Sequence, residues 1–247
     1  MSMRITTQGL LWLAVLGGPA AGWSAPPAAQ PPPARVLIIG DSMMKLPAHA
    51  LELALAGRAG VTTRAYTSIG SGLARLDSFD WMEKTRTLLA EFNPDMTLVW
   101  FGTNDRQPMQ TADRIIKVED AEWPEEYARR VGALMDLITT PPAARMLWLE
   151  LPDMRDDKIQ KDVLLINRLV QTEAGKRSRV EFFLTRPILG HRPGKFTPYV
   201  IGPKGMPIQL RDPDGMHLNR AGADRLAEHL VQAIYGTNTG SKTIESQ

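Results

Sequence analysis

Three groups of polar residues have the types and positions that nucleophilic catalysis by serine requires. Ser42 directly follows an apolar run at residues 36–39, and Asn104 follows a second apolar run. His217 comes three residues after Asp214, just ahead of an amphipathic stretch. A serine nucleophile needs a base within hydrogen-bond reach, a group that orients the base, and donors aimed at the oxyanion. The sequence offers a candidate for each of these roles.

The position of Ser42 supports this chemistry only in combination with the other residues. Residues beyond the carboxyl end of a buried strand line the crevice where open α/β sheets bind ligands. Helical spacing follows Ser42, so free N–H groups and the helix dipole should favour developing negative charge there. Alone, Gly40-Asp41-Ser42 is better explained as an ordinary strand-to-helix turn in which serine caps the helix. The other two groups of residues reverse that preference.

Among the four histidines, His217 is the best candidate for the base. His49 and His229 fall within predicted helices and are expected on their surfaces. His191 lies in a loop, where a substrate contact and a solvent-exposed side chain fit equally well. The acid three residues before His217 can fold back on the imidazole, fix its tautomer and stabilise the imidazolium.

Other acidic residues leave two alternatives open. Asp212 rivals Asp214 as the orienting acid, but it is two residues further from His217. Asp41 and Asp105 are compatible with a metal-dependent phosphoesterase. Such a site needs several histidine and carboxylate ligands that converge, and most of the histidines here are in the wrong places. We therefore expect no metal site.

Four short blocks occur in one order along the chain: Gly40-Asp41-Ser42, Ser68-Ile69-Gly70-Ser71-Gly72-Leu73, Gly102-Thr103-Asn104-Asp105 and Asp214-Gly215-Met216-His217. In order and spacing they resemble the GDSL/SGNH hydrolases, a family of serine esterases and lipases. The resemblance covers residues 35–235. Flanking residues such as Leu151-Pro152-Asp153-Met154-Arg155 resemble a bacterial exported branch of this family.

The resemblance implies a role for each matching residue. Ser42 would attack the substrate carbonyl, His217 would take the serine proton, and Asp214 would orient His217. The oxyanion hole would consist of the backbone N–H groups of Ser42 and Gly72 together with the side chain of Asn104.

Two of the oxyanion assignments have competitors. Gly70 competes with Gly72, which is preferred because Ser-Gly-Leu matches the exported branch better. An asparagine after a strand also commonly hydrogen-bonds its own loop, which is the structural alternative for Asn104.

Strand-like and helix-like segments alternate from residue 35 onward. The predicted strands are residues 36–39, 61–66, 96–101, 145–149 and 180–184. The predicted helices are residues 47–56, 81–92, 124–138, 162–174 and 219–234. This alternation predicts an α/β fold, a three-layer α/β/α sandwich around a five-stranded, mostly parallel sheet. The family resemblance implies the flavodoxin-like strand order.

Two long stretches, residues 105–123 and 185–213, show no regular pattern. Loops of this length in a compact domain are usually functional or disordered. The second stretch precedes the acid–histidine turn and carries several apolar residues. We therefore expect an ordered rim in which Phe196 and Tyr199 bind substrate. A flexible hairpin is the structural alternative.

Residues 1–24 have the layout of a signal peptide, with a charged start, a short apolar run and small residues after it. The apolar run is too short for a membrane span. We expect a periplasmic or secreted protein with no stable membrane insertion after cleavage, and an uncleaved anchor is the alternative. A Pro/Ala-rich linker at 25–34 would lead into a hydrolase domain at 35–236 and a flexible tail at 237–247.

Composition argues against several other classes of protein. The 247 residues are 43% hydrophobic, which fits one domain with a sizeable core. A net charge of +2, spread along the chain, argues against nucleic-acid partners, and the absence of cysteine rules out disulfides. The sequence has no Walker or dinucleotide fingerprint and no Gly-x-Ser-x-Gly elbow, so we expect no cofactor and no α/β-hydrolase fold.

Taken together, the sequence predicts a serine esterase that forms an acyl-enzyme on Ser42. Export and the family resemblance suggest a small ester or an O-acylated glycan of the cell envelope as substrate. An O-acyltransferase would use the same triad, with a sugar hydroxyl in place of water. A non-catalytic protein that binds an envelope glycan is a further hypothesis, and the complete set of Ser, His, Asp and Asn argues against it.

Overall fold

The computed structural model describes residues 31–190, 195–202 and 204–236. Contacts divide the chain into residues 1–31 and residues 32–247, and every helix and strand given below belongs to the second unit. The predicted signal peptide, the start of the linker, the C-terminal tail and His191 lie outside the described residues and stay predictions.

The centre of the fold is one parallel sheet built from the predicted strands. It contains β1 (Arg35–Gly40), β2 (Thr62–Thr67), β3 (Met96–Trp100), β6 (Arg145–Leu149) and β7 (Val180–Phe183) in the order β2-β1-β3-β6-β7. In chain order this is second, first, third, fourth and fifth, the flavodoxin-like arrangement that the family resemblance implied. The strand order reverses between β1 and β3, so residues after these two strands flank the crevice where such sheets bind ligands.

Burial within the sheet explains why its strands were recognisable. Val36, Leu37, Ile38 and Ile39 of β1 are fully buried, as are all five residues of β3. Strands covered on both faces need such continuous apolar runs. The edge strand β2 is only half-buried and carries threonine, arginine and tyrosine.

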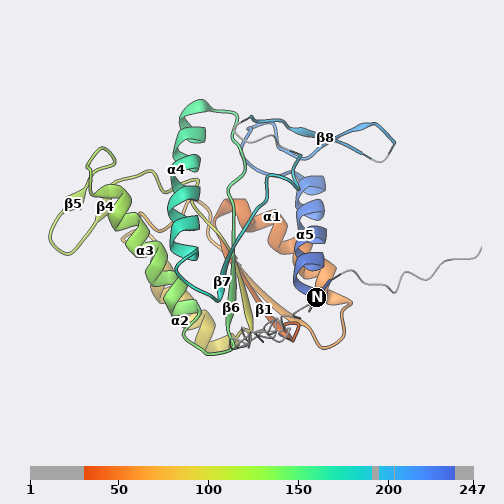
Figure 1. Ribbon diagram of the computed structural model, residues 1–247, viewed down its shortest axis with the longest axis horizontal. Coiled ribbons are helices and arrows are strands. Elements are labelled where there is room, and N and C mark those ends of the chain that lie inside the picture. The colour runs from red at the N-terminus through yellow and green to blue at the C-terminus, as the bar shows by residue number, and fades with distance from the viewer. Residues whose placement is uncertain (1–30, 191–194, 203, 237–247) are drawn as a thin grey trace, which may run out of the picture. The chain divides into compact units, whose positions relative to one another are not determined.

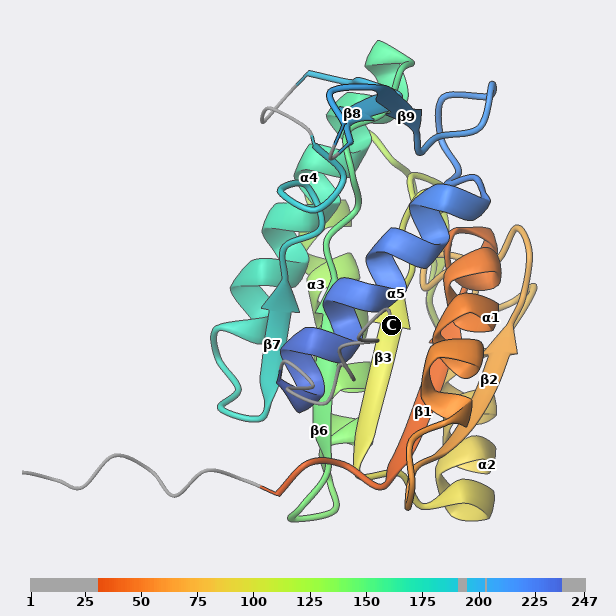
Figure 2. The same cartoon turned by 90° about the vertical axis from the view of Figure 1, so that its right-hand side faces the viewer.

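Helices cover both faces of the sheet and make three layers (Figures 1 and 2). α1 (Ser42–Ala56) and α5 (Arg220–Tyr235) pack against each other on one face. α2 (Trp81–Phe92), α3 (Trp123–Ile138) and α4 (Asp157–Ala174) cover the other face. This confirms the predicted three-layer α/β/α class.

Two helices begin five residues earlier than the sequence predicted, and in both a capping side chain sets the start. Asp41 accepts a hydrogen bond from Met43, so α1 begins at Ser42 rather than at 47, with Pro47 inside the helix. Asp156 accepts from the N–H groups of Lys158 and Ile159, so α4 begins at 157 rather than 162.

The two stretches predicted to be irregular each contain a short antiparallel hairpin. The first holds β4 (Met109–Gln110) and β5 (Ile115–Ile116), and the second holds β8 (Tyr199–Ile201) and β9 (Pro207–Gln209). Figure 1 shows the β8 hairpin above the upper end of α5, beyond the carboxyl edge of the sheet. In the described part of the chain, no helix has the length and apolar character to cross a bilayer.

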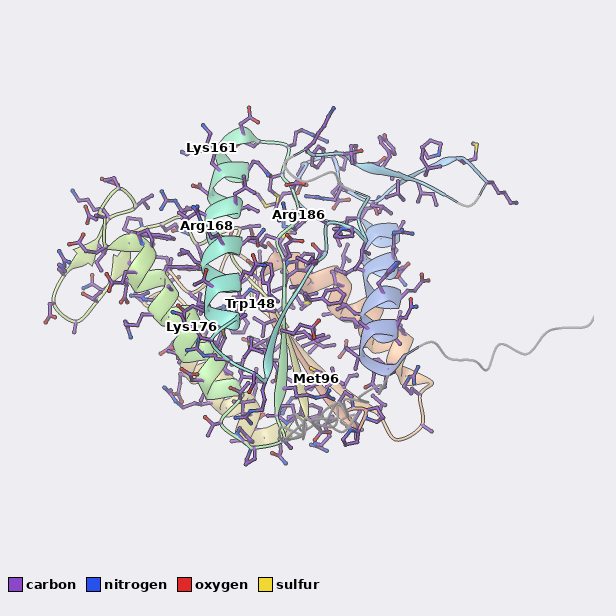
Figure 3. All side chains as sticks on the ribbon, in the orientation of Figure 1. Met96, Trp148, Lys161, Arg168, Lys176 and Arg186 are labelled. Atoms are coloured by element: carbon purple, nitrogen blue, oxygen red, sulfur yellow. The ribbon has the colours of Figure 1, made fainter. Side chains whose placement is uncertain are left out.

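Side-chain burial separates the core from the outer faces of the helices. Met96 and Trp148 lie on sheet strands and are almost fully buried, whereas Lys161 and Arg168 on α4 point outward (Figure 3). Four tryptophans are fully buried and anchor this core: Trp81, Trp100, Trp123 and Trp148.

Candidate active site

Ser42 is the first residue of α1, just beyond the carboxyl end of β1. Asp41 caps the helix through a 2.8 Å hydrogen bond from the N–H of Met43. Gly40 lets the backbone pass close to β3, because a Cβ there would lie 2.5 Å from the carbonyl oxygen of Trp100. Among the described residues the Ser42 N–H has no acceptor, as expected in a first helical turn, so it can donate to a bound group.

His217 lies on the turn between β9 and α5, and it joins Ser42 to Asp214. Its Nε2 is 2.9 Å from the hydroxyl oxygen of Ser42, and its Nδ1 is 2.5 Å from Oδ2 of Asp214. The other oxygen of Asp214 accepts the N–H groups of Met216 and His217 at 2.8 and 3.0 Å. Asp212, the rival acid, contacts His217 through backbone atoms. The three side chains therefore form one continuous hydrogen-bonded series.

The charge state of Asp214 suits this arrangement. Burial raises the pKa of its carboxyl, but hydrogen bonds from the His217 ring and from the N–H groups of Met216 and His217 outweigh this effect and lower that pKa. An ionised Asp214 holds a proton on Nδ1, which leaves Nε2 to accept the proton of Ser42. The side chains of His217 and Asp214 are 31% and 47% exposed, so water can reach them.

Two arginines hold the turn that carries His217. Arg211 is fully buried, and its Nη2 donates to the carbonyl oxygen of Met216 at 2.6 Å. Nη1 of Arg155 donates to the carbonyl oxygen of Pro213 at 2.6 Å. Gly215 has φ +77°, and a Cβ there would lie 2.5 Å from Cβ of Arg155, so the turn requires glycine at this position. Neither arginine was assigned a role from the sequence, because nothing in the local pattern shows what these side chains contact.

Phe196 and Tyr199 were predicted to contact the substrate, and their surroundings differ from each other. The ring of Phe196 is 5.1 Å from the guanidinium carbons of both Arg155 and Arg211. Tyr199 belongs to β8 and is 47% exposed. Phe196 therefore packs on the two side chains that hold the His217 turn.

Asn104 lies in the loop after β3 and bridges two neighbouring segments. Its Nδ2 donates to the carbonyl oxygen of Ser71 at 3.0 Å and to Oδ2 of Asp41 at 3.3 Å. The amide nitrogen thus faces both the segment that carries Ser42 and residues 68–73, the block that contains Gly70 and Gly72 and is called the glycine block below. The role of Asn104 as an oxyanion donor stays a prediction.

The glycine block contains one buried and one exposed glycine. A Cβ on buried Gly72 would lie 2.0 Å from Oδ1 of Asp105, so only glycine fits there. Asp105 also accepts the N–H of Ala74 at 2.9 Å and the hydroxyl of Tyr127 at 2.7 Å, which fixes the block. The Gly72 N–H has no acceptor among the described residues. Gly70 is exposed, with φ +72° and open space around it.

Asp41 and Asp105 are both fully buried. Burial raises the pKa of Asp41 to about 7, with a further contribution from the charge of Asp105. Burial likewise raises the pKa of Asp105. In the part of the chain that the structure describes, no group of three or more His, Cys, Asp or Glu residues is arranged to hold a metal ion.

A cavity of about 400 Å³ opens beside the nucleophile, lined by Ser42, Met43, Lys45, Leu46, Ile69, Asp212, His217 and Leu218. Leu46 and Ile69 are 38% and 67% exposed, so their apolar surface is available to a ligand. Phe196 and Tyr199 are outside this lining. The positions of Leu46 and Ile69 in the sequence could have indicated that they line the cavity. Leu46 is one helical turn after Ser42, and Ile69 belongs to the block that contains Gly70 and Gly72.

The model of a family described as "Protein of unknown function (DUF459)" matches residues 35–233. No curated protein matches the sequence.

Several solved structures are similar in fold. They include an acetyl esterase mutant with an acetate ion, at 13% identity and a TM-score of 0.52, covering 81% of this chain and 97% of that one. An acetylxylan esterase from Geobacillus stearothermophilus has 17% identity and a TM-score of 0.52, covering 81% and 94%. A carbohydrate esterase family 3 protein from Talaromyces cellulolyticus has 12% identity and a TM-score of 0.52, covering 82% and 99%. The resemblance to the SGNH hydrolases is thereby confirmed for the fold.

Proposed function

We propose that this chain, which belongs to the family described as "Protein of unknown function (DUF459)", hydrolyses carboxylic esters through an acyl-enzyme on Ser42. One observation carries the proposal: Nε2 of His217 is 2.9 Å from the Ser42 hydroxyl while Asp214 contacts Nδ1 at 2.5 Å. This is the hydrogen-bonded order of nucleophile, base and orienting acid that acyl transfer by serine needs. The fold shared with solved esterases supports the same reaction class.

In the first half-reaction, the Ser42 oxygen attacks the ester carbonyl and its proton passes to Nε2 of His217. Asp214 stabilises the imidazolium that results. The carbonyl oxygen becomes an oxyanion, which accepts hydrogen bonds from the Ser42 and Gly72 N–H groups and from Asn104. Collapse breaks the bond to the alcohol oxygen, which leaves with the proton from His217.

In the second half-reaction, water replaces the alcohol. His217 takes a proton from the water, whose oxygen attacks the acyl-enzyme, and the proton returns to Ser42 as the acid leaves. The partial exposure of His217 supports this step, because water can approach the base. A sugar hydroxyl that used the same approach would make the protein an O-acyltransferase.

The substrate we propose is an O-acyl ester of a glycan or a similar small ester. The cavity beside Ser42, about 400 Å³ in volume, can hold a sugar ring or an acyl chain. Leu46 and Ile69 supply apolar surface for either group. Two of the similar structures are named as an acetylxylan esterase and a carbohydrate esterase, which favours acylated polysaccharide.

We further propose that the protein acts in the periplasm or outside the cell, where envelope polysaccharides occur. The proposal rests on residues 1–24, which have the charged, apolar and small-residue regions of a signal peptide. Mass spectrometry of protein recovered from the periplasm should show a chain that lacks these residues. An intact N-terminus on membrane-bound protein would favour the uncleaved anchor instead.

The decisive experiment measures turnover of short aryl esters by the purified protein and by Ser42→Ala and His217→Ala. We expect each variant to lose roughly 10⁴-fold or more in kcat, and the double variant to be little worse than either single one. Ser78→Ala and His49→Ala, at exposed residues outside the cavity lining, are the matched controls and should retain full activity. Full activity in Ser42→Ala would end the serine mechanism.

A further inference from the structure

Asp41 links the nucleophile to the proposed oxyanion donor from a fully buried position. Its N–H donates to the carbonyl oxygen of Trp100 at 3.1 Å, and its Oδ1 caps α1 through Met43 at 2.8 Å. The backbone of Asp41 is thus tied to β3, and its side chain to the helix that begins with Ser42. Asp41 is 0% exposed, so it cannot itself be a surface contact for substrate.

The other oxygen of Asp41 faces donors from the block that follows β3. Oδ2 accepts from the Gly102 N–H at 3.3 Å, the Thr103 hydroxyl at 3.5 Å and the Asn104 amide at 3.3 Å. Three donors from consecutive residues therefore converge on one carboxylate oxygen. A buried carboxylate needs such partners, because an unpaired charge in the interior is costly.

An asparagine side chain can donate or accept, depending on which way its amide points. Two acceptors face the Asn104 amide, Oδ2 of Asp41 and the carbonyl oxygen of Ser71. A flipped amide would place its own oxygen against both of them, which is electrostatically unfavourable. The two acceptors therefore select the orientation in which Asn104 presents N–H groups, and an oxyanion can be stabilised only by that orientation.

We propose that Asp41 is a positioning residue of the reaction, which fixes the Asn104 amide as a hydrogen-bond donor and ties it to the start of the helix that carries Ser42. This inference rests on the proposed function. The contact with Asp41 is longer than the contact with Ser71, and in this proposal the N–H that faces Asp41 is the one that is shared with the developing oxyanion. Asp41 acts through Asn104 and does not touch the reacting atoms.

The test compares Asp41→Ser and Asp41→Asn in aryl ester turnover, each in the native chain and in Asn104→Ala. Serine still caps a helix, but it is too short to reach Asn104, so we expect kcat to fall roughly 10-fold to 100-fold with little change in KM. Asparagine has the shape of aspartate and can accept from the Asn104 amide, so Asp41→Asn should recover part of this loss.

The Asn104→Ala background separates positioning from a general structural effect. Asn104→Ala alone should lower kcat by roughly 10²–10³-fold, as the loss of one oxyanion donor does. If Asp41 acts through Asn104, neither substitution at 41 should lower kcat further in that background. Multiplicative losses, or native kcat in Asp41→Ser, would overturn the inference.

Two controls keep the outcomes distinct. Asp80→Asn alters the cap of α2, where the carboxylate accepts from the N–H groups of Met82 and Glu83 and not from Asn104, and it should leave kcat unchanged. If Asp41→Ser does not fold, Asp41→Asn in the two backgrounds makes the same comparison. Activity that survives Ser42→Ala would remove the proposed function itself, whereas loss of activity in Ser42→Ala with independent effects at 41 and 104 would remove only this inference.

Discussion

Asp41 precedes Ser42 in the chain and Asp214 is connected to Ser42 through His217, and the surroundings of the two carboxyl groups shift their pKa values in opposite directions. Asp41 is fully buried, and burial raises its pKa to about 7. Asp214 is partly exposed, and its hydrogen bonds with His217 and the turn backbone outweigh burial and lower its pKa. The acid that must stabilise an imidazolium is therefore ionised at neutral pH, whereas Asp41 is near its titration midpoint.

This difference predicts how stability depends on pH at Asp41. Its pKa is raised from 3.8 to about 7 in the folded protein, so between these values the folded state binds more protons than the unfolded chain. The contribution of Asp41 to the free energy of unfolding must then fall as pH rises through this window. Asp41→Asn has no such proton, so the native chain should lose stability relative to Asp41→Asn as pH increases. Asp105 and Tyr127 also face Asp41, and they remain in both proteins.

Denaturant unfolding of both proteins across this pH window measures the effect. The helix cap is altered at every pH, so only the change in the stability difference with pH reports on the carboxyl group. Asp80→Asn provides a second cap variant with which the effect of Asp41→Asn is compared. A stability difference between the native chain and Asp41→Asn that does not vary with pH would show that the Asp41 carboxyl does not have the raised pKa.

At the scale of elements, the strands could be predicted from the sequence more accurately than the first residues of the helices. The side chains that hold the His217 turn could not be predicted. The strands were visible because β1 and β3 are unbroken apolar runs. The start of α1 was missed because Pro47 looked like a first helical residue, whereas the cap is made by the side chain of Asp41. Arg155 and Arg211 could not be assigned, since each holds the His217 turn through contacts that depend on the folded chain.

Phe196 and Ile69 are two apolar residues near the site, and their different contacts predict separate roles for them. Phe196 packs on Arg155 and Arg211, so Phe196→Ala should loosen the His217 turn and lower kcat for all esters in proportion. Ile69 lines the cavity and contributes exposed apolar surface, so Ile69→Ser should change the preference between short and long acyl groups. It should leave turnover of a small activated ester nearly intact.

Aryl esters of increasing acyl length, assayed with both variants, distinguish these roles. Ile115→Ser, an exposed isoleucine on β5, is the matched control for Ile69→Ser and should not alter the preference. The sequence-based prediction for Phe196 is the reverse pattern, a changed preference with the small ester unaffected. That result would return Phe196 to the substrate-binding residues.

At the scale of the whole molecule, the site is assembled from segments that are far apart in the sequence. Ser42 follows β1, Gly72 follows β2, Asn104 follows β3, and the Asp214–His217 turn precedes α5. Parallel strands bring their carboxyl ends to one edge, so an α/β alternation predicted that the first three would meet. The position of the last turn depends on long-range contacts such as those of Arg155 and Arg211, and no local pattern encodes those contacts.

The division of the chain predicts that residues 1–30 are dispensable for folding and catalysis. The described helices and strands and all the site residues belong to the unit that begins at Pro32, and this unit has its own buried core. A variant that begins at Pro31 keeps the hydrogen bond from the Ala34 N–H to Oδ2 of Asp95 and the one from the Tyr235 hydroxyl to the carbonyl oxygen of Pro33. Its melting temperature, kcat and KM for an aryl ester should therefore equal those of the full chain. A matched loss of melting temperature and kcat would mean that residues 1–30 support the fold, and a rise in KM alone would mean that they contribute to substrate binding.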